Sequence, residues 1–271
     1  MLDDISRRIW TTVFGEIDPT DLISKHGPGS TADKISNNKR YRIRKWNDRS
    51  ELMFPSDLHC FFNYEQALWA SQENLTGEMT FLSVLEEIPV RVVFVPKTQS
   101  SPRVIAIEPA HMQYVQQSVK DYIYRRLEEH PLTKNSLRFT DQNPNKILAC
   151  LGSIDNGLAT IDLKDASDRV HFELVRRIFR GSGILDYLED ARSLHAELPD
   201  GTSRILNKYA SQGSALCFPV EAMVFYTLIQ SAMHTFDSVT PCSRSIKHYS
   251  RLISVFGDDI IVPTRYTEAI S

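Results

Sequence analysis

Residues 254–263 read SVFGDDIIVP and place two adjacent acidic side chains, Asp258 and Asp259, inside an otherwise apolar run. Gly-Asp between two runs of β-forming residues is typical of a tight hairpin turn, where acidic side chains are exposed to water. Two neighbouring carboxylates repel each other at low dielectric constant, and a divalent cation such as Mg²⁺, which prefers oxygen ligands, offsets that repulsion. The stretch by itself leaves a plain turn and a metal site open.

The bulk properties are those of a globular protein without a membrane span. The chain has 271 residues, 42% of them hydrophobic and 24% charged, which is enough for one large domain or two smaller ones. No apolar run approaches the roughly 18 residues of a membrane span, and the N-terminus, MLDDISRRIW, lacks the apolar region of a signal peptide. The four cysteines form no C-x-x-C pair, which disfavours a zinc site or a disulfide scaffold and indicates reduced thiols in a cytosol.

Basic residues gather locally although the net charge is −3. A negative net charge gives no global attraction to nucleic acid. Between residues 34 and 49, however, only Asp48 opposes the basic side chains, which are Lys34, Lys39, Arg40, Arg42, Arg44, Lys45 and Arg49. Such a run lines a polyanion channel in some proteins and is a solvated surface loop in others, and both interpretations stay open.

The hydrophobic pattern predicts an α+β chain with few strands and several long helices. Strands are expected at 91–95, 104–109 and 158–163, the last of them buried, and helices over 110–129, about 167–180 and 217–236. An Asp-Gly pair predicts a hairpin within 197–206, and the opening stretch predicts another. Residues 1–90 are expected to be mixed and largely helical.

A second acidic stretch, IDLKDASD at 161–168, follows the expected strand at 158–163. Asp165 and Asp168 suit the N-cap of the next helix, whereas Asp162 comes several residues too early for that role. A strand-end carboxylate and a hairpin pair could converge on two divalent ions, an arrangement that suits phosphoryl transfer. One ion would lower the pKa of an attacking hydroxyl, and the other would neutralise a leaving pyrophosphate.

Two loops carry further candidates. Lys97 and Arg103 lie in VPKTQSSPR (95–103) and could contact a triphosphate, Arg as a bidentate donor and Lys as a point charge. Gly213 in SQGSA (211–215) permits backbone conformations that other residues avoid, so this loop could approach a nucleotide. Exposed loop cations and a plain lead-in to a helix explain the same residues equally well, and the order of the elements therefore carries more weight than any one of them.

In their order, these elements resemble the RNA-directed RNA polymerases (replicase beta subunits) of single-stranded RNA bacteriophages, the levivirus family that includes phage Q-beta. The resembling segments cover most of 25–265 and are HGPGST (26–31), residues 95–127, LATIDLKDASD (158–168), residues 198–213 with the helix through Glu221, and VFGDDIIVP (255–263). Phe256 stands where Tyr is usual, Ser214-Ala215 where Asn-Gly is common, and Lys164-Asp165 where residues are small.

The resemblance implies a right-hand polymerase fold. Fingers would occupy 1–157, including a basic loop at 95–109 where nucleotides enter. A palm, with a short antiparallel sheet packed by helices, would occupy 158–271, with a segment at about 185–210 that contacts the fingers. Members of the family continue well past Gly-Asp-Asp, so the resemblance implies a partial chain that is truncated after this hairpin and lacks the thumb.

The resemblance also implies roles for individual residues. Asp162, Asp258 and Asp259 match catalytic ligands of two Mg²⁺ ions, for which Mn²⁺ could substitute. The nucleotide-binding positions are Lys97 and Arg103 at the triphosphate, Ser167 and Asp168 near the ribose, where a polar group could recognise the 2′-hydroxyl, and Ser211 and Gly213 in the loop that faces template and nucleotide. Lys39, Arg40, Arg42, Arg44 and Lys45 would contact RNA, and neither Asp165 nor Glu221 receives a role.

The implied activity is template-directed transfer of a ribonucleotide to a 3′-hydroxyl with release of pyrophosphate. The substrates would be an RNA template and ribonucleoside triphosphates, in the cytoplasm of an infected bacterial host and without a membrane. The Q-beta enzyme recruits host elongation factors Tu and Ts and a ribosomal protein, which are candidate partners. Two alternatives stay open: an inactive RNA-binding fragment of such a replicase, and the palm of a reverse transcriptase.

Overall fold

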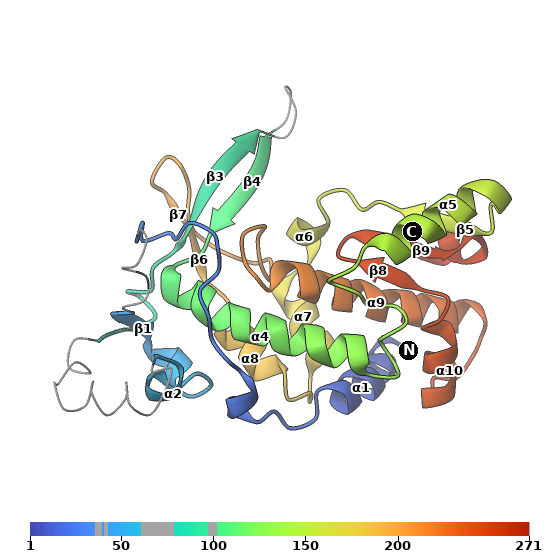
Figure 1. Cartoon of the computed structure of the whole chain (residues 1–271), viewed down its shortest axis with the longest axis horizontal. Coiled ribbons are helices and arrows are strands. Elements are labelled where there is room, and N and C mark those ends of the chain that lie inside the picture. The colour runs from blue at the N-terminus through green and yellow to red at the C-terminus, as the bar shows by residue number, and fades with distance from the viewer. Residues whose placement is uncertain (36–39, 41–42, 61–78, 97–101, 271) are drawn as a thin grey trace. The chain divides into compact units, whose positions relative to one another are not determined.

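The computed structural model describes residues 1–35, 40, 43–60, 79–96 and 102–270 (Figure 1). The chain forms two compact units, and neither is continuous in sequence. Unit 1 comprises Met1–Ile17, Asp121–Leu185 and Cys217–Ser271, and unit 2 comprises Asp18–Lys120 and Asp186–Leu216. Within the described residues, no helix combines the length and the apolar character needed to cross a membrane, and the four cysteines are free.

Unit 1 is mostly helical around a small sheet. Its helices are α1 (Leu2–Val13), α5 (Asn143–Asp155), α6 (Ala166–Arg169), α7 (Phe172–Phe179), α9 (Cys217–Phe236), α10 (Ser243–Tyr249), the 3₁₀ turn η5 (Thr264–Tyr266) and α11 (Thr267–Ile270). Its strands are β5 (Leu158–Ile161), β8 (Ser254–Phe256) and β9 (Asp259–Pro263). They form an antiparallel sheet in the order β5-β9-β8, with β9 in the middle.

Helix α9 is the centre of unit 1. Its sequence, CFPVEAMVFYTLIQSAMHTF, is apolar on nearly every side, and most of the helix is buried. Such a pattern is expected in a core rather than at a surface. The helix packs against α1, α7 and β8. Trp10 of α1 donates a hydrogen bond from Nε1 to Oγ1 of Thr227 in α9 (3.0 Å), so the polar atom of this buried ring is satisfied.

Unit 2 contains two sheets beside the first part of helix α4 (Ala110–Glu129). Its other elements are η1 (Pro19–Asp21), β1 (Lys45–Asn47), η3 (Asp48–Glu51), α2 (Ser56–Cys60), β2 (Thr80–Leu82), β3 (Val90–Pro96), β4 (Pro102–Ile107), α8 (Leu185–Asp190), β6 (His195–Glu197) and β7 (Ser203–Ile205). One sheet has the order β4-β3-β6-β7, and β1 pairs with β2 in parallel. Strands β3 and β4 form a long hairpin (Figure 1).

Arg49 ties together distant segments of unit 2. Its guanidinium binds both carboxylate oxygens of Glu87, at 2.5 and 3.2 Å. It also donates to the backbone carbonyls of Asp190 (2.8 Å) and Arg192 (2.7 Å). A planar guanidinium offers several donors in a fixed geometry, which suits it to such a junction. Arg49, a member of the basic run at 34–49, therefore has a structural role.

Most predicted elements are confirmed, including the helices at 110–129 and 217–236 and both hairpins. The predicted helix over about 167–180 is wrong as a single element, because it is divided into α6 and α7. His171 lies between them with an extended backbone, and its Nδ1 accepts a hydrogen bond from the backbone N–H of Glu173 (3.1 Å). This side chain caps α7 and so fixes where the second helix begins.

Three further differences have simple causes. The strand at 158–163 is shorter and half-exposed rather than buried, because β5 is an edge strand. Helix α5 was not expected, since its polar first residues, Asn-Pro-Asn, look like a connection. The expectation that 1–90 is largely helical is wrong for its described part, in which α1 is the one helix longer than five residues.

The turn between β8 and β9 depends on Gly257. Phe256 pairs with Asp259, which leaves Gly257 and Asp258 as a two-residue turn. Gly257 has φ +64°, and a Cβ there would lie 2.1 Å from the ring of Phe218 in α9. That ring also packs edge-to-face on Phe256, with centroids 5.1 Å apart. Glycine at the first central position fits a II′ hairpin turn, and here it also makes room for the aromatic ring beneath.

Gly257→Ala should destabilise the protein more than Gly181→Ala. Both glycines have positive φ, but a Cβ at Gly181 would meet nothing within 4 Å. Left-handed strain alone costs about 1–2 kcal/mol, and overpacking against the ring of Phe218 adds about 1–3 kcal/mol. Urea unfolding of the two variants measures the difference. Equal destabilisation would contradict the close contact between the turn and α9.

Candidate active site

Three carboxylates lie at one end of the sheet in unit 1. Asp259 is the first residue of the central strand β9, and Asp258 precedes it in the turn. Ile161 pairs with Ile260, so Asp162, which follows β5, occupies the next register position beside Asp259. All three side chains are exposed. The strand register thus brings together residues that lie almost 100 positions apart in the chain.

Asp259 is held by polar groups at the start of α5. Gln142 donates a hydrogen bond from Nε2 to Oδ2 of Asp259 (2.9 Å). Asn145 donates from Nδ2 to the backbone carbonyl of Asp259 (3.1 Å), and the hydroxyl of Ser254 donates to Oδ1 of Asn145 (2.6 Å). Sequence reasoning missed these residues because it read 133–146 as a connection. The Asn-Pro-Asn start of a helix was the signal that could have located them.

Glu221 lies in α9 beneath the same turn. The residue is buried, and its Oε2 has no hydrogen-bond partner. Burial, and secondly the negative charge of Asp258, raise the pKa of its carboxyl to about 8. With this pKa the carboxyl of Glu221 is mostly protonated at neutral pH, and none of the salt bridges among the described residues includes Glu221. The sequence singled out this residue and gave it no role.

The remaining predicted residues of unit 1 lie on α6. Ser167 is buried and Asp168 is exposed. Asp165 occupies the predicted N-cap position of α6, but it has φ +54° and makes no side-chain capping bond. The N-cap prediction is wrong for Asp168, which lies inside the helix. A left-handed residue between β5 and α6 turns the chain sharply just after Asp162.

The predicted loop at 211–215 belongs to unit 2 and is attached to strand β4. The backbone N–H of Ala106 donates to the carbonyl of Gln212 (2.8 Å). Gly213 has φ +124°, and a Cβ there would lie 2.1 Å from the carbonyl oxygen of Ala106. Buried Gln116 accepts from the hydroxyl of Ser214 (3.2 Å) and the backbone N–H of Ala215 (3.3 Å). Glycine is required at position 213 because the backbone of strand β4 lies too close for a side chain and because the positive φ disfavours other residues.

Strand β4 also carries Arg103, which is exposed and pairs with Val95 of β3. The strand therefore connects a predicted triphosphate contact with the loop that contains Ser211 and Gly213, all within unit 2. Ser211 is buried. Lys97 lies outside the described residues.

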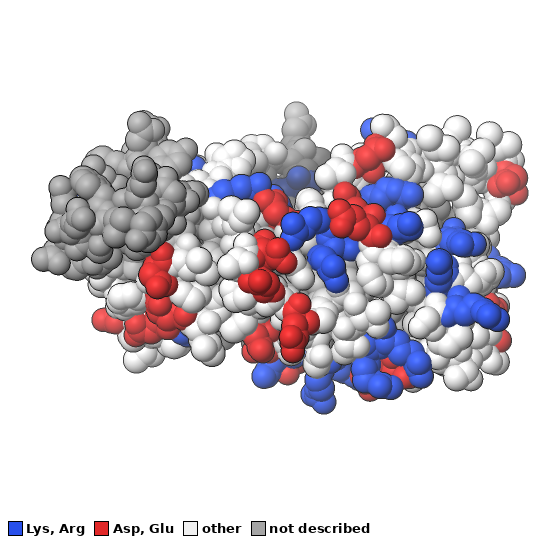
Figure 2. Space-filling model, turned by 60° about the horizontal axis from the view of Figure 1, so that its bottom comes forward, with Lys and Arg blue, Asp and Glu red and all other residues white. Residues whose placement is uncertain are grey.

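Three members of the predicted basic cluster, Arg40, Arg44 and Lys45, line a cavity in unit 2. Lys39 and Arg42 lie outside the described residues. On the face that Figure 2 shows, basic and acidic side chains are interspersed over much of the surface, in keeping with a net charge of −3. The structure gives local basic sites rather than a broad positive field.

No group of three or more His, Cys, Asp and Glu side chains is already arranged to hold a metal ion in the part of the chain that the structure describes. The donors at the hairpin are all carboxylate oxygens, the ligand type that Mg²⁺ and Mn²⁺ accept. Their chemistry fits a hard divalent cation.

Glu221→Gln should flatten the pH dependence of stability. The pKa of Glu221 is about 8 in the folded protein against an ordinary 4.5. Between these values the unfolded state releases a proton that the folded state keeps, so stability falls as pH rises, by up to about 1.4 kcal/mol per pH unit. Urea unfolding in EDTA from pH 5 to 8 should show a shallower fall for the variant. Glu268→Gln, at an exposed site, is the control, and parallel curves for all three proteins would refute the assignment.

Comparisons with known proteins show which family the chain resembles. The family model "RNA replicase, beta-chain" matches residues 63–270. The RNA-directed RNA polymerase subunit beta of Enterobacteria phage SP is 33% identical over 205 residues, which are 75% of this chain and 32% of the relative. The corresponding beta chain of Escherichia phage MS2 is 32% identical over 173 residues, 64% of this chain and 28% of that one. The chain therefore spans about a third of the length of these relatives.

A solved structure, the RNA-dependent RNA polymerase from bacteriophage phi12, superposes with a TM-score of 0.51. The match covers 99% of this chain and 50% of that one at 13% identity, which supports a shared fold and no more. The chain is a mixed helix-and-strand protein with a phage RNA polymerase as structural neighbour. From the family match over most of its length and its identity to the beta subunits, the chain belongs to the RNA replicase beta-chain family.

Proposed function

We propose that the chain is the catalytic fingers-and-palm part of a phage RNA-directed RNA polymerase. The observation that supports this proposal is the strand register, which puts residues 162, 258 and 259 at the same end of the β5-β9-β8 sheet. Family membership makes nucleotidyl transfer the expected chemistry for such a site. The reaction is attack of a 3′-hydroxyl on the α-phosphate of a ribonucleoside triphosphate, directed by an RNA template, with release of pyrophosphate.

We assign the two compact units to the two functional parts. This assignment replaces the expected boundary between 1–157 and 158–271, because Met1–Ile17 and Asp121–Leu185 belong to unit 1 and Asp186–Leu216 belongs to unit 2. Unit 1 contains the antiparallel sheet and the helices packed on it, and we assign it to the palm. Unit 2 contains the β3–β4 hairpin and the loop attached to it, and we assign it to the fingers. The segment Asp186–Leu216 lies between palm elements in sequence and belongs to unit 2. This supports the expected fingers-contacting role of about 185–210.

The three aspartates would hold two Mg²⁺ ions, or Mn²⁺ in their place. When bound, the ions activate the attacking hydroxyl and neutralise the charge of the leaving pyrophosphate. The contribution of the protein is to fix the ligands. Gln142 orients the carboxylate of Asp259, and Asn145 anchors its backbone. A rigid supporting set of hydrogen bonds of this kind keeps ligands in place before substrate arrives.

Other residues would bind the nucleotide. Arg103 would contact the triphosphate, for which an exposed guanidinium on a regular strand is suited, and Lys97 would assist. Ser167 and Asp168 would lie near the ribose, and Ser211 and Gly213 would face template and nucleotide. The partners would be RNA and ribonucleoside triphosphates, and host elongation factors Tu and Ts with a ribosomal protein are candidates. The setting would be the cytoplasm of an infected bacterium.

Asp258→Asn should weaken metal binding and remove most ribonucleotide incorporation while the fold is kept. The side chain is exposed, so the isosteric amide leaves packing unchanged. Titration of free Mn²⁺ by electron paramagnetic resonance should show weaker binding, and incorporation on a primed RNA template should fall by about a hundredfold or more. Glu268→Gln is a matched control, because it follows the opposite end of β9. Near-normal incorporation by Asp258→Asn would exclude the metal role.

The same assay separates the alternatives. A reverse transcriptase would prefer deoxyribonucleotides on the RNA template, whereas the proposed polymerase prefers ribonucleotides. An inactive RNA-binding fragment would bind RNA and incorporate neither. In a further outcome, the unsubstituted chain binds Mn²⁺ in a way that Asp258→Asn weakens and yet incorporates no nucleotide. That result would support the metal site and exclude polymerase activity of this chain alone.

A further inference from the structure

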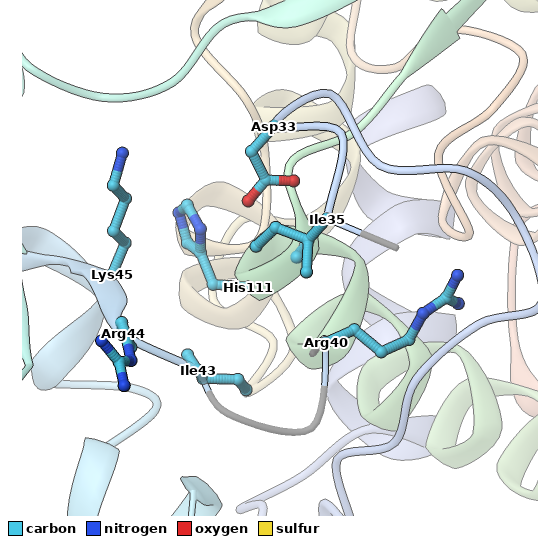
Figure 3. A pocket seen from close by; sticks show the side chains of 8 residues that line it. Asp33, Ile35, Arg40, Ile43, Arg44, Lys45 and His111 are labelled. Atoms are coloured by element: carbon cyan, nitrogen blue, oxygen red, sulfur yellow. The ribbon is translucent and has the colours of Figure 1, made fainter. Parts of the chain in front are cut away.

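A cavity of about 520 Å³ in unit 2 has none of the residues assigned above to catalysis in its lining. Its lining includes Asp33, Ile35, Ile43, Arg44, Lys45 and His111 (Figure 3). The size falls in the range of small-molecule sites, about 300–1,000 Å³. The lining combines aliphatic side chains, cations and one carboxylate, which is a set that can contact each part of a nucleotide.

The turn that carries Asp33 is fixed by hydrogen bonds, but one carboxylate oxygen of Asp33 has no hydrogen-bond partner. The backbone N–H of Ala32 donates to the carbonyl of Glu108 (2.9 Å), and Thr31 Oγ1 accepts from the N–H of Ile35 (3.1 Å). These bonds fix the turn that carries Asp33. Its Oδ1 is buried and has no hydrogen-bond partner. A buried acceptor without a donor is unfavourable and marks a place where a ligand N–H could bind.

His111 forms part of the wall without adding charge. The residue is buried, and Nε2 lies 2.9 Å from Oδ1 of Asn47. Burial, together with the positive charges of Arg49 and Lys45, lowers the pKa of its imidazole to about 4. The ring is therefore neutral and does not compete with a ligand for Asp33. Figure 3 shows the ring of His111 below the carboxylate of Asp33.

Two cations lie at the rim. Arg44 and Lys45 are exposed and line the cavity. Arg40 is different, because its Nη1 donates to the carbonyl of Gly27 (2.8 Å) and its guanidinium points away from Asp33 (Figure 3). Arg44 and Lys45 are suited to bind the phosphate of a nucleotide, because the attraction between a phosphate and basic side chains does not depend on which base the nucleotide has.

We propose that this cavity binds a guanine nucleotide, with the base against Ile35 and Ile43 and its phosphate on Arg44 and Lys45. Guanine presents two adjacent N–H donors, N1–H and the 2-amino group, to one carboxylate. Adenine and cytosine offer one amino donor beside an acceptor, and uracil offers one N–H between two carbonyls. Asp33 therefore selects guanine. The inference rests on the proposed function only in taking RNA as one source of the nucleotide.

The test is fluorescence anisotropy of the 271-residue chain with labelled adenine-rich RNA oligomers that differ at one central base. The central nucleoside is guanosine, inosine or adenosine. Guanine should bind about tenfold more tightly than inosine, which lacks the 2-amino group. Asp33→Asn should remove that preference. Asp48→Asn, at an exposed acid outside the cavity, should keep it. Matching thermal unfolding of the two variants shows that both are folded.

Further experiments test whether the ligand is a free nucleotide or part of an RNA, and how much the basic side chains contribute to binding. Arg44→Ala and Lys45→Ala should weaken all oligomers alike and lower the salt dependence by about one counterion each. Competition by guanosine monophosphate tests whether the cavity binds a free nucleotide or a residue of RNA. If the ligand is an RNA residue, the oligomer should bind more tightly than guanosine monophosphate. Equal affinity for the three bases, or equal behaviour of Asp33→Asn and Asp48→Asn, overturns the proposal. None of these measurements requires incorporation, so failure of polymerase activity would leave their result unaffected.

Discussion

Strand β9 pairs along both of its edges, with β5 on one side and β8 on the other. This pairing is the constraint on which the candidate active site depends. A shift of one residue in the β5–β9 register would move Asp162 away from Asp259 and turn its side chain to the other face. The apolar residues Ile260, Ile261 and Val262 oppose such a shift, because all three are buried in the present register.

The same hairpin is fixed from below by aromatic packing. Phe218 of α9 contacts Phe256 edge-to-face and occupies the space that a side chain at 257 would need. Phe139 packs on Phe218 in turn, with centroids 6.0 Å apart. The turn that presents Asp258 is thus joined to the most buried helix of unit 1. Rigid support is useful for a site that must hold charged ligands close together.

Buried polar side chains connect separate segments of unit 2. Gln116 donates to the carbonyl of Ala191 (3.0 Å) and accepts from the 214–215 loop, so one buried side chain joins α4 to two loops. Glu108 is fully buried with a hydrogen bond from Ser193, and burial raises its pKa to about 7. Such networks favour one arrangement, because each partner would be left unsatisfied in any other.

Much of the local structure follows from the sequence. The apolar stripe of 110–129 and the continuous apolar run of 217–236 predict two long helices, and Gly-Asp and Asp-Gly predict two hairpins. The break at His171 and the start of α5 were missed, because a side-chain cap and a polar helix start leave little trace in hydrophobicity.

Membership of the RNA replicase beta-chain family was also predictable from the sequence, because ordered motifs indicate it. Other features required the tertiary structure. The alignment of Asp162 with Asp259, the contact of Gln142 with Asp259, and the cavity around Asp33 join residues from separate parts of the chain. Local periodicity reports which face of an element is apolar, whereas strand register and cavity shape arise only when distant elements pack together.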